Sequence, residues 1–130
     1  MKKVFILIFL LMVLIILCNC NTTNTPVSYD INRITINYDD KSVDLKSDEC
    51  ADWETVLTGK ILQDNPSCGF SDKYSLTVYD KEQTISFCFA MDGCPKLKIG
   101  NTDRYLCISE QNNVILHSLL ENYGIVFPLI

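Results

Sequence analysis

Residues 74–91 have the sequence YSLTVYDKEQTISFCFAM. Apolar side chains occupy every second position on both sides of a polar segment, DKEQ, at residues 80–83. Strict alternation is typical of a strand with one buried face, and a polar segment between two such strands is typical of a turn. We therefore predict an antiparallel hairpin, with one face formed by Tyr74, Leu76, Val78, Ile85, Phe87, Phe89 and Met91.

Two more strands are predicted on the C-terminal side of this hairpin. Asp92-Gly93 is a strong signal for a two-residue turn, and it is followed by a strand over 97–99 and another over 104–108. With a two-residue turn, Cys88 and Cys94 do not stand opposite each other. This register therefore disfavours a disulfide between these two cysteines.

The C-terminal part of the chain predicts a helix. Ser109 is a favourable N-cap, and apolar residues recur at helical spacing over 110–123. Gly124 stands where a left-handed residue commonly ends a helix. The apolar tail 125–130 is too short to span a membrane, so we expect it to pack on the core or to add an edge strand.

The N-terminal side of the hairpin predicts a second hairpin and a second helix. Apolar residues alternate over 34–38 and again over 43–45, around a turn. Residues 49–62 then place apolar side chains at helical spacing, namely Trp53, Val56, Leu57 and Ile61. We expect Trp53 to pack in the core and Asp64-Asn65-Pro66 to end the helix.

The order of predicted elements is strand, strand, helix, four strands, helix (ββαββββα). Two amphipathic helices and one mainly antiparallel sheet predict a two-layer α+β domain. The chain has 130 residues and is 48% hydrophobic, so it can form one modest core and is too apolar for a disordered tail. Its formal net charge of −5 argues against nucleic-acid binding.

The first twenty residues predict a location outside the cytoplasm. Lys2 and Lys3 precede the apolar run VFILIFLLMVLIILC, residues 4–18. This run is short for a membrane span, which needs about 20 residues, and it has the order of a signal peptide. The polar segment 19–26 follows without the charges of a stop-transfer sequence. A plain secretory signal and an uncleaved anchor are the alternatives.

A cysteine at the end of such a core, followed by a polar stretch, resembles the signal peptide of bacterial lipoproteins. In Leu17-Cys18-Asn19-Cys20 the leucine stands three places before Cys20, as in the lipoprotein box. The resemblance implies acylation of Cys20 and anchoring of the chain to a membrane through its N-terminal lipid. Cys18 is the alternative acylation site.

The chain is therefore predicted to consist of a lipoprotein-type signal peptide over 1–20, a flexible tether over 21–28 and a single α+β domain over 29–130. The half of the chain from Tyr74 onward also resembles small uncharacterised lipoproteins of AT-rich bacteria, with the strand-to-helix step YLCISE at 105–110. This resemblance implies a fold and an address, and no known activity.

The five cysteines of the predicted domain allow at most two disulfides and one free thiol. Disulfides are plausible outside the cytoplasm and would stabilise a small core. Cys50 and Cys68 flank the first predicted helix, so they can meet if the following loop folds back. The spacing does not decide the connectivity among Cys50, Cys68, Cys88, Cys94 and Cys107.

We expect no catalytic, cofactor-binding or metal-binding residues. The domain has no close cysteine pair for zinc and only one histidine, His117, which we place on the polar face of the second helix next to Glu121. No nucleophile elbow or phosphate-binding loop is present. The acidic residues of the first hairpin and helix lack calcium-loop spacing and indicate a solvated face; they are Asp39, Asp40, Asp44, Asp48, Glu49 and Asp52.

These observations favour a lipid-anchored, extracytoplasmic protein of the cell envelope or cell membrane that binds an unknown protein partner without catalysis. A sheet covered by helices on one face leaves its other face, and its edge strands, available for a partner. The alternative from another class is a secreted inhibitor or effector of cystatin-like size without a lipid anchor. A small hydrolase or redox enzyme is the third hypothesis.

Overall fold

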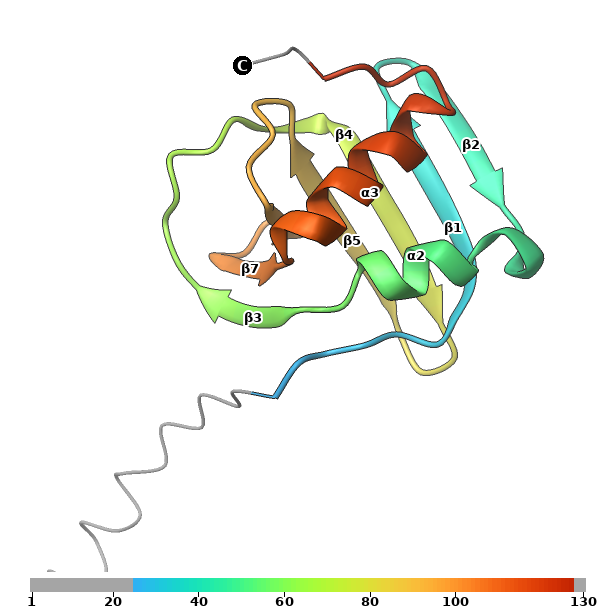
Figure 1. Ribbon diagram of the computed structural model, residues 1–130, viewed down its shortest axis with the longest axis horizontal. Helices are drawn as coiled ribbons and strands as arrows, with labels where there is room; N and C mark the ends of the chain where they lie inside the picture. The colour runs from blue at the N-terminus through green and yellow to red at the C-terminus, as the bar shows by residue number, and fades with distance from the viewer. Residues whose placement is uncertain (1–24, 128–130) are drawn as a thin grey trace, which may run out of the picture.

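The computed structural model describes residues 25–127. In that part of the chain, one antiparallel sheet of seven strands lies beneath two helices, which share one face of the sheet (Figure 1). The prediction of a broadly α+β domain with a mainly antiparallel sheet and two helices is therefore confirmed. The sheet has one strand more than predicted.

The strands follow a simple topology in which most sequence neighbours are also neighbours in space. The sheet order is β2-β1-β4-β5-β6-β7-β3, and all pairs are antiparallel. The strands are β1 (Ile31–Tyr38), β2 (Lys41–Leu45), β3 (Lys60–Gln63), β4 (Phe70–Asp80), β5 (Thr84–Ala90), β6 (Lys96–Ile99) and β7 (Arg104–Cys107). The two α-helices of the described part are α2 (Ala51–Val56) and α3 (Glu110–Glu121), and a single 3-10 turn, η1 (Ser47–Glu49), precedes α2.

The predicted hairpin over 74–91 forms β4 and β5 at the centre of the sheet. Leu76 pairs with Phe87, and Val78 pairs with Ile85. The alternating apolar residues of both strands face the helices, and Leu76, Val78 and Phe87 are fully buried. Alternation in the sequence thus predicts the buried face of the sheet.

The helix predicted over 49–62 is shorter than expected, because α2 ends at Val56 and the chain then forms the unpredicted strand β3. A Cβ atom at Gly59 would lie 2.2 Å from the carbonyl oxygen of Cys107, so the close approach of β3 to β7 requires glycine there. Ile61, predicted as part of the helical stripe, instead packs against the core from β3.

The two-residue turn predicted at Asp92-Gly93 is also wrong. Such a turn would pair Cys88 with Leu97, whereas in the structure Phe89 pairs with Leu97 and the connection extends over 91–95. Gly93 has a φ of 78°, which a wider loop uses as readily as a tight turn. The register therefore shifts by one residue, and the apolar side chains of β5 and β6 remain on the same face.

The C-terminal predictions are confirmed over the described residues. Ser109 caps α3 by accepting a hydrogen bond from the backbone N–H of Asn112 at 3.1 Å, and Gly124 has a φ of 82°. The tail returns to the core through Ile125 and Phe127, both buried. Residues 128–130 lie outside the described part of the chain.

A candidate site on the open face of the sheet

The face of the sheet opposite α2 and α3 carries side chains that alternate with the buried ones. We call it the open face. Its residues on five adjacent strands are Thr35, Asn37, Ser75, Thr77, Ser86, Cys88, Lys96, Lys98, Tyr105 and Cys107. Most of them are half-buried or exposed, although they lie in the middle of a seven-stranded sheet.

One row of the open face runs across the whole centre of the sheet. In register, Asn37 stands beside Ser75, Ser75 beside Cys88, Cys88 beside Lys98, and Lys98 beside Tyr105. The Asn37 side-chain amide donates to the Ser75 hydroxyl at 3.4 Å. The row therefore changes from neutral hydrogen-bonding groups on β1 and β4 to a cation and an aromatic ring on β6 and β7.

An open groove of about 660 Å³ lies at the end of this row. Its lining is polar and carries both charges, and it consists of Gln63, Asp64, Asn65, Lys98, Asn101, Thr102, Asp103 and Tyr105. Because donors, acceptors and charges of both signs meet there, the groove is suited to polar contacts with a partner.

An ion pair links the rim of this groove to β6. The ammonium group of Lys96 contacts the carboxylate of Asp64, which also accepts the backbone N–H of Asn65 at 2.8 Å. The hydrogen bond from Lys96 lowers the pKa of Asp64 and raises the pKa of Lys96. Both groups are therefore charged at neutral pH, and the segment after β3 is fixed beside the open face.

A small, mostly apolar cluster lies on the same half of the open face. The rings of Phe70 and Tyr105 are 5.4 Å apart, and Phe70 pairs with Ala90, which is only 2% exposed. Cys88 is also buried, and burial raises the pKa of its thiol. The open face is thus polar near β1 and β4 and partly closed by an aromatic pair near β5 and β7.

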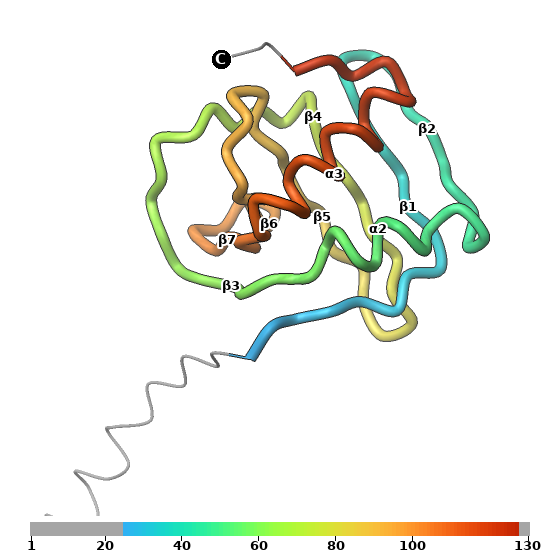
Figure 2. The backbone as a smooth tube through the Cα atoms, in the orientation of Figure 1, coloured from blue at the N-terminus to red at the C-terminus, as the bar shows by residue number. Residues whose placement is uncertain are grey.

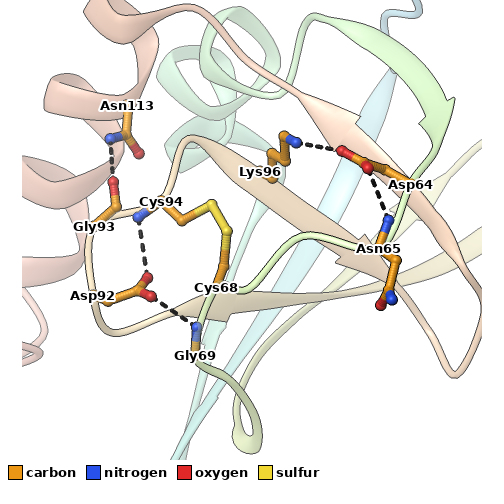
Figure 3. The surroundings of a disulfide bond; sticks show 9 residues. All are labelled: Asp64, Asn65, Cys68, Gly69, Asp92, Gly93, Cys94, Lys96 and Asn113. Carbon is orange, nitrogen blue, oxygen red and sulfur yellow. Dashed lines mark hydrogen bonds and ion pairs between the residues drawn. A yellow bond between two sulfur atoms is a disulfide. The ribbon is translucent and has the colours of Figure 1, made fainter.

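A disulfide between Cys68 and Cys94 links the segment before β4 to the loop between β5 and β6 (Figure 3). Asp92 adds to this link, because its carboxylate accepts the backbone N–H of Gly69 at 2.8 Å and that of Cys94 at 3.3 Å. The buried Asn113 of α3 donates its side-chain amide to the carbonyl oxygen of Gly93 at 2.9 Å. The segment before β4, the loop between β5 and β6, and α3 are therefore linked to one another.

The remaining cysteines of the described part are free thiols: Cys50, Cys88 and Cys107. The suggested meeting of Cys50 with Cys68 does not occur, because Cys68 is bonded to Cys94. Cys50 is buried at the N-terminus of α2, where its thiol donates to the carbonyl oxygen of Lys46 at 3.1 Å. Burial raises the pKa of Cys50, and the nearby acidic groups raise it further. No group of three potential metal ligands occurs within residues 25–127.

His117 does not project freely into solvent beside Glu121. Its ring is half-buried and stacks on Phe127 with centroids 3.8 Å apart and planes inclined by 5°. Burial lowers the pKa of His117, and the charge of Glu121 opposes that shift. The acidic residues of the first hairpin and helix, in contrast, are exposed as predicted.

Comparisons with protein-family models, curated proteins and solved structures found no match for this chain. The predicted acylation sites, Cys20 and Cys18, lie outside the described residues. Over residues 25–127, no helix has the length and hydrophobicity to cross a membrane. The function is therefore inferred from residues and geometry alone.

Proposed function

We propose that this chain is a non-catalytic binding module of the cell envelope, anchored to the membrane by a lipid at Cys20, which binds a protein partner through its open face. The observation that carries the proposal is the row of side chains from Asn37 to Tyr105 on that face, in which Cys88 and Tyr105 are buried, together with the groove at its end. A central sheet face without a covering layer presents many hydrogen-bonding groups on a rigid frame.

The opposite face supports this assignment by contrast. α2, α3 and the tail cover it and bury the apolar residues of the sheet (Figure 1). Its large exposed apolar side chains, Val114 and Val126, stand singly, and isolated apolar residues are normal on any surface. The side chains suited to a partner therefore gather on the open face.

The lipid would hold the domain close to the membrane. Thr25, the first described residue, follows Cys20 by five positions, so the intervening chain spans at most about 18 Å. The chain enters the fold beside the β4–β5 turn, at the end of the sheet away from the C-terminus (Figure 1). This end would face the membrane, and the open face would be presented sideways.

Site-specific photo-crosslinking in cells that naturally produce the chain tests the proposed binding face. A photoreactive amino acid replaces Thr77 or Lys98 on the open face, and Val114 on α3 serves as the matched control. We expect both open-face positions to give an adduct with the same protein and Val114 to give none. Adducts from Val114 alone, or from none of the three positions, would contradict the proposal.

A further inference from the structure

A second hollow lies on the helix-bearing side of the sheet, between the N-terminal segment, β3 and the ends of β5 and β6. Its volume is about 170 Å³, and it shares no lining residue with the groove on the open face. Figure 2 shows the N-terminal segment, in blue, crossing this end of the fold below β3 and α2. Val27 fixes that segment, because its N–H and carbonyl both pair with Gly59, at 2.7 and 3.2 Å.

Most of the wall of this hollow is aliphatic. It is formed by Val27, Ile61, Ile85 and Ile99, all of which are only partly buried and pack against the edge of the core. The exposed Gln83 adds one polar side chain to the lining. The helices leave these side chains partly uncovered, since α2 ends at Val56 and the following residues form β3. The hollow is therefore an apolar extension of the core that is open to a small ligand.

Tyr29 brings a hydrogen-bonding group to this apolar surface. The residue lines the hollow and is 5% exposed, and its ring packs edge-on against Phe87 with centroids 5.8 Å apart. Its hydroxyl is buried and has no hydrogen-bond partner within residues 25–127. An unpaired buried hydroxyl is unfavourable, so a ligand that reaches this group and accepts its proton would gain a hydrogen bond that the described residues do not supply.

Arg104 supplies the charge. It also lines the hollow, is exposed, and makes no ion pair or side-chain hydrogen bond with any other residue of the described part. Burial raises the pKa of Tyr29, and the charge of Arg104 opposes this shift. The acidic group that also acts on Tyr29, Asp80, already accepts the backbone N–H groups of Asp30 and Glu82.

We propose that this hollow binds a small carboxylate with a short aliphatic chain. The carboxylate would pair with the Arg104 guanidinium and accept the hydroxyl of Tyr29, and the chain would lie between Ile61, Ile85 and Ile99. At about 30 Å³ for a water-sized group, the hollow holds about six non-hydrogen atoms. A five-carbon acid has seven, so it would fill the hollow with part of its carboxylate outside, at the exposed Arg104. This inference is independent of the open face and of the lipid anchor.

Pentanoate is the probe for a test by methyl NMR, because three wall residues are isoleucines. The full chain is labelled at its isoleucine methyl groups, purified in detergent and titrated with pentanoate. We expect saturable shifts at Ile61, Ile85 and Ile99, and none at Ile34 and Ile36, which lie in the core under α2 and α3. Pentan-1-ol and pentylamine have the same chain without the carboxylate and should bind at least tenfold more weakly.

Two variants locate the carboxylate. Arg104→Gln should weaken pentanoate binding at least about tenfold, because it removes a charge-assisted contact, and Tyr29→Phe should weaken it several-fold while keeping the ring. Arg33→Gln, an equally exposed arginine that stacks on Tyr79 elsewhere in the fold, is the matched control and should leave binding unchanged. Equal binding of pentan-1-ol, an unaffected Arg104→Gln variant or the absence of saturable shifts would overturn the proposal.

Discussion

The two halves of the sheet are stabilised in different ways. In the first half, formed by β2, β1, β4 and β5, the strands run to 8 and 11 residues in β1 and β4 and bury a regular apolar face under α3. In the second half, β6, β7 and β3 have four residues each. This short-stranded half is fixed by the Cys68–Cys94 disulfide, the Lys96–Asp64 ion pair and the close approach at Gly59.

This difference determines what the polar side chains do in each half of the sheet. Long strands under helices need their apolar side chains for the core, and their other face stays plainly polar. Short strands bury too little apolar area to be stable by themselves, so covalent and polar links around them are needed. One of these links, the ion pair between Lys96 and Asp64, includes a lining residue of the groove and keeps it in position for a partner.

The largest effect is expected from the long-stranded half. Phe87→Ala removes a fully buried ring that packs on Tyr29 and should lower the free energy of unfolding by about 3–5 kcal/mol. Urea denaturation of the purified chain measures this loss. Val114→Ala, at a position 69% exposed, is the control and should change stability by less than about 0.5 kcal/mol. A similarly small loss of unfolding free energy in both variants would contradict the conclusion that the buried apolar face of the long-stranded half stabilises the fold.

The next effect belongs to the disulfide. The double variant Cys68→Ser, Cys94→Ser opens a cross-link of sequence separation 26 and should lower stability by about 3 kcal/mol, within the usual range for such loops. Amide hydrogen exchange should accelerate in β6, β7 and β3 more than in β1 and β4. Cys107→Ser, which alters a free thiol in the same half, provides the control. Uniform acceleration in all strands would contradict the division into two halves.

A smaller effect is expected at Gly59. An added Cβ would lie 2.2 Å from the Cys107 carbonyl oxygen, so Gly59→Ala should separate β3 from β7 and cost about 1–3 kcal/mol. At Gly69 the nearest atom to such a Cβ is 3.6 Å away, and Gly69→Ala should be nearly neutral. Thermal denaturation of the two variants compares them directly, and equal stabilities would refute the close contact between β3 and β7.

The smallest effect concerns the covered face and its pH dependence. Burial lowers the pKa of His117 in the folded chain, so the unfolded chain takes up the proton first as pH falls through about 6.5. Stability should therefore decrease from about pH 7 downward and level out below the folded pKa. His117 is the only histidine, so His117→Gln should abolish this part of the dependence. Urea midpoints that rise on acidification would contradict the buried stack on Phe127.

The sequence predicted the long-stranded half well because its signals are local. Alternation over 74–91 defined β4 and β5, and Ser109 and Gly124 marked the ends of α3. Strand β3 was missed because Ile61 suits a helix after Leu57 as well as a strand. The strand is favoured by the close approach of Gly59 to Cys107, which is 48 positions away in the chain. A local sequence pattern cannot contain such a contact.

The candidate site was less predictable for the same reason. Two helices and one sheet were enough to predict an uncovered sheet face. The groove, however, is formed largely by residues around Asp64, after β3, and around Asp103, between β6 and β7, and these two connections are far apart in the sequence. The Cys68–Cys94 pair joins loops that flank β4 and β5. The only local indication of a polar face in this half was the alternation of Lys96 and Lys98 in β6.

Peptide mass spectrometry of the membrane-fraction protein, alkylated in denaturant before reduction, tests both the lipid anchor at Cys20 and the Cys68–Cys94 disulfide. We expect an N-terminal peptide that begins at Cys20 with diacylglyceryl mass, a linked Cys68–Cys94 peptide pair, and alkylation of Cys50, Cys88 and Cys107. A chain without lipid recovered from the medium would contradict the anchor and favour the secreted inhibitor or effector. Alkylation of Cys68 and Cys94 before reduction would contradict the disulfide between them.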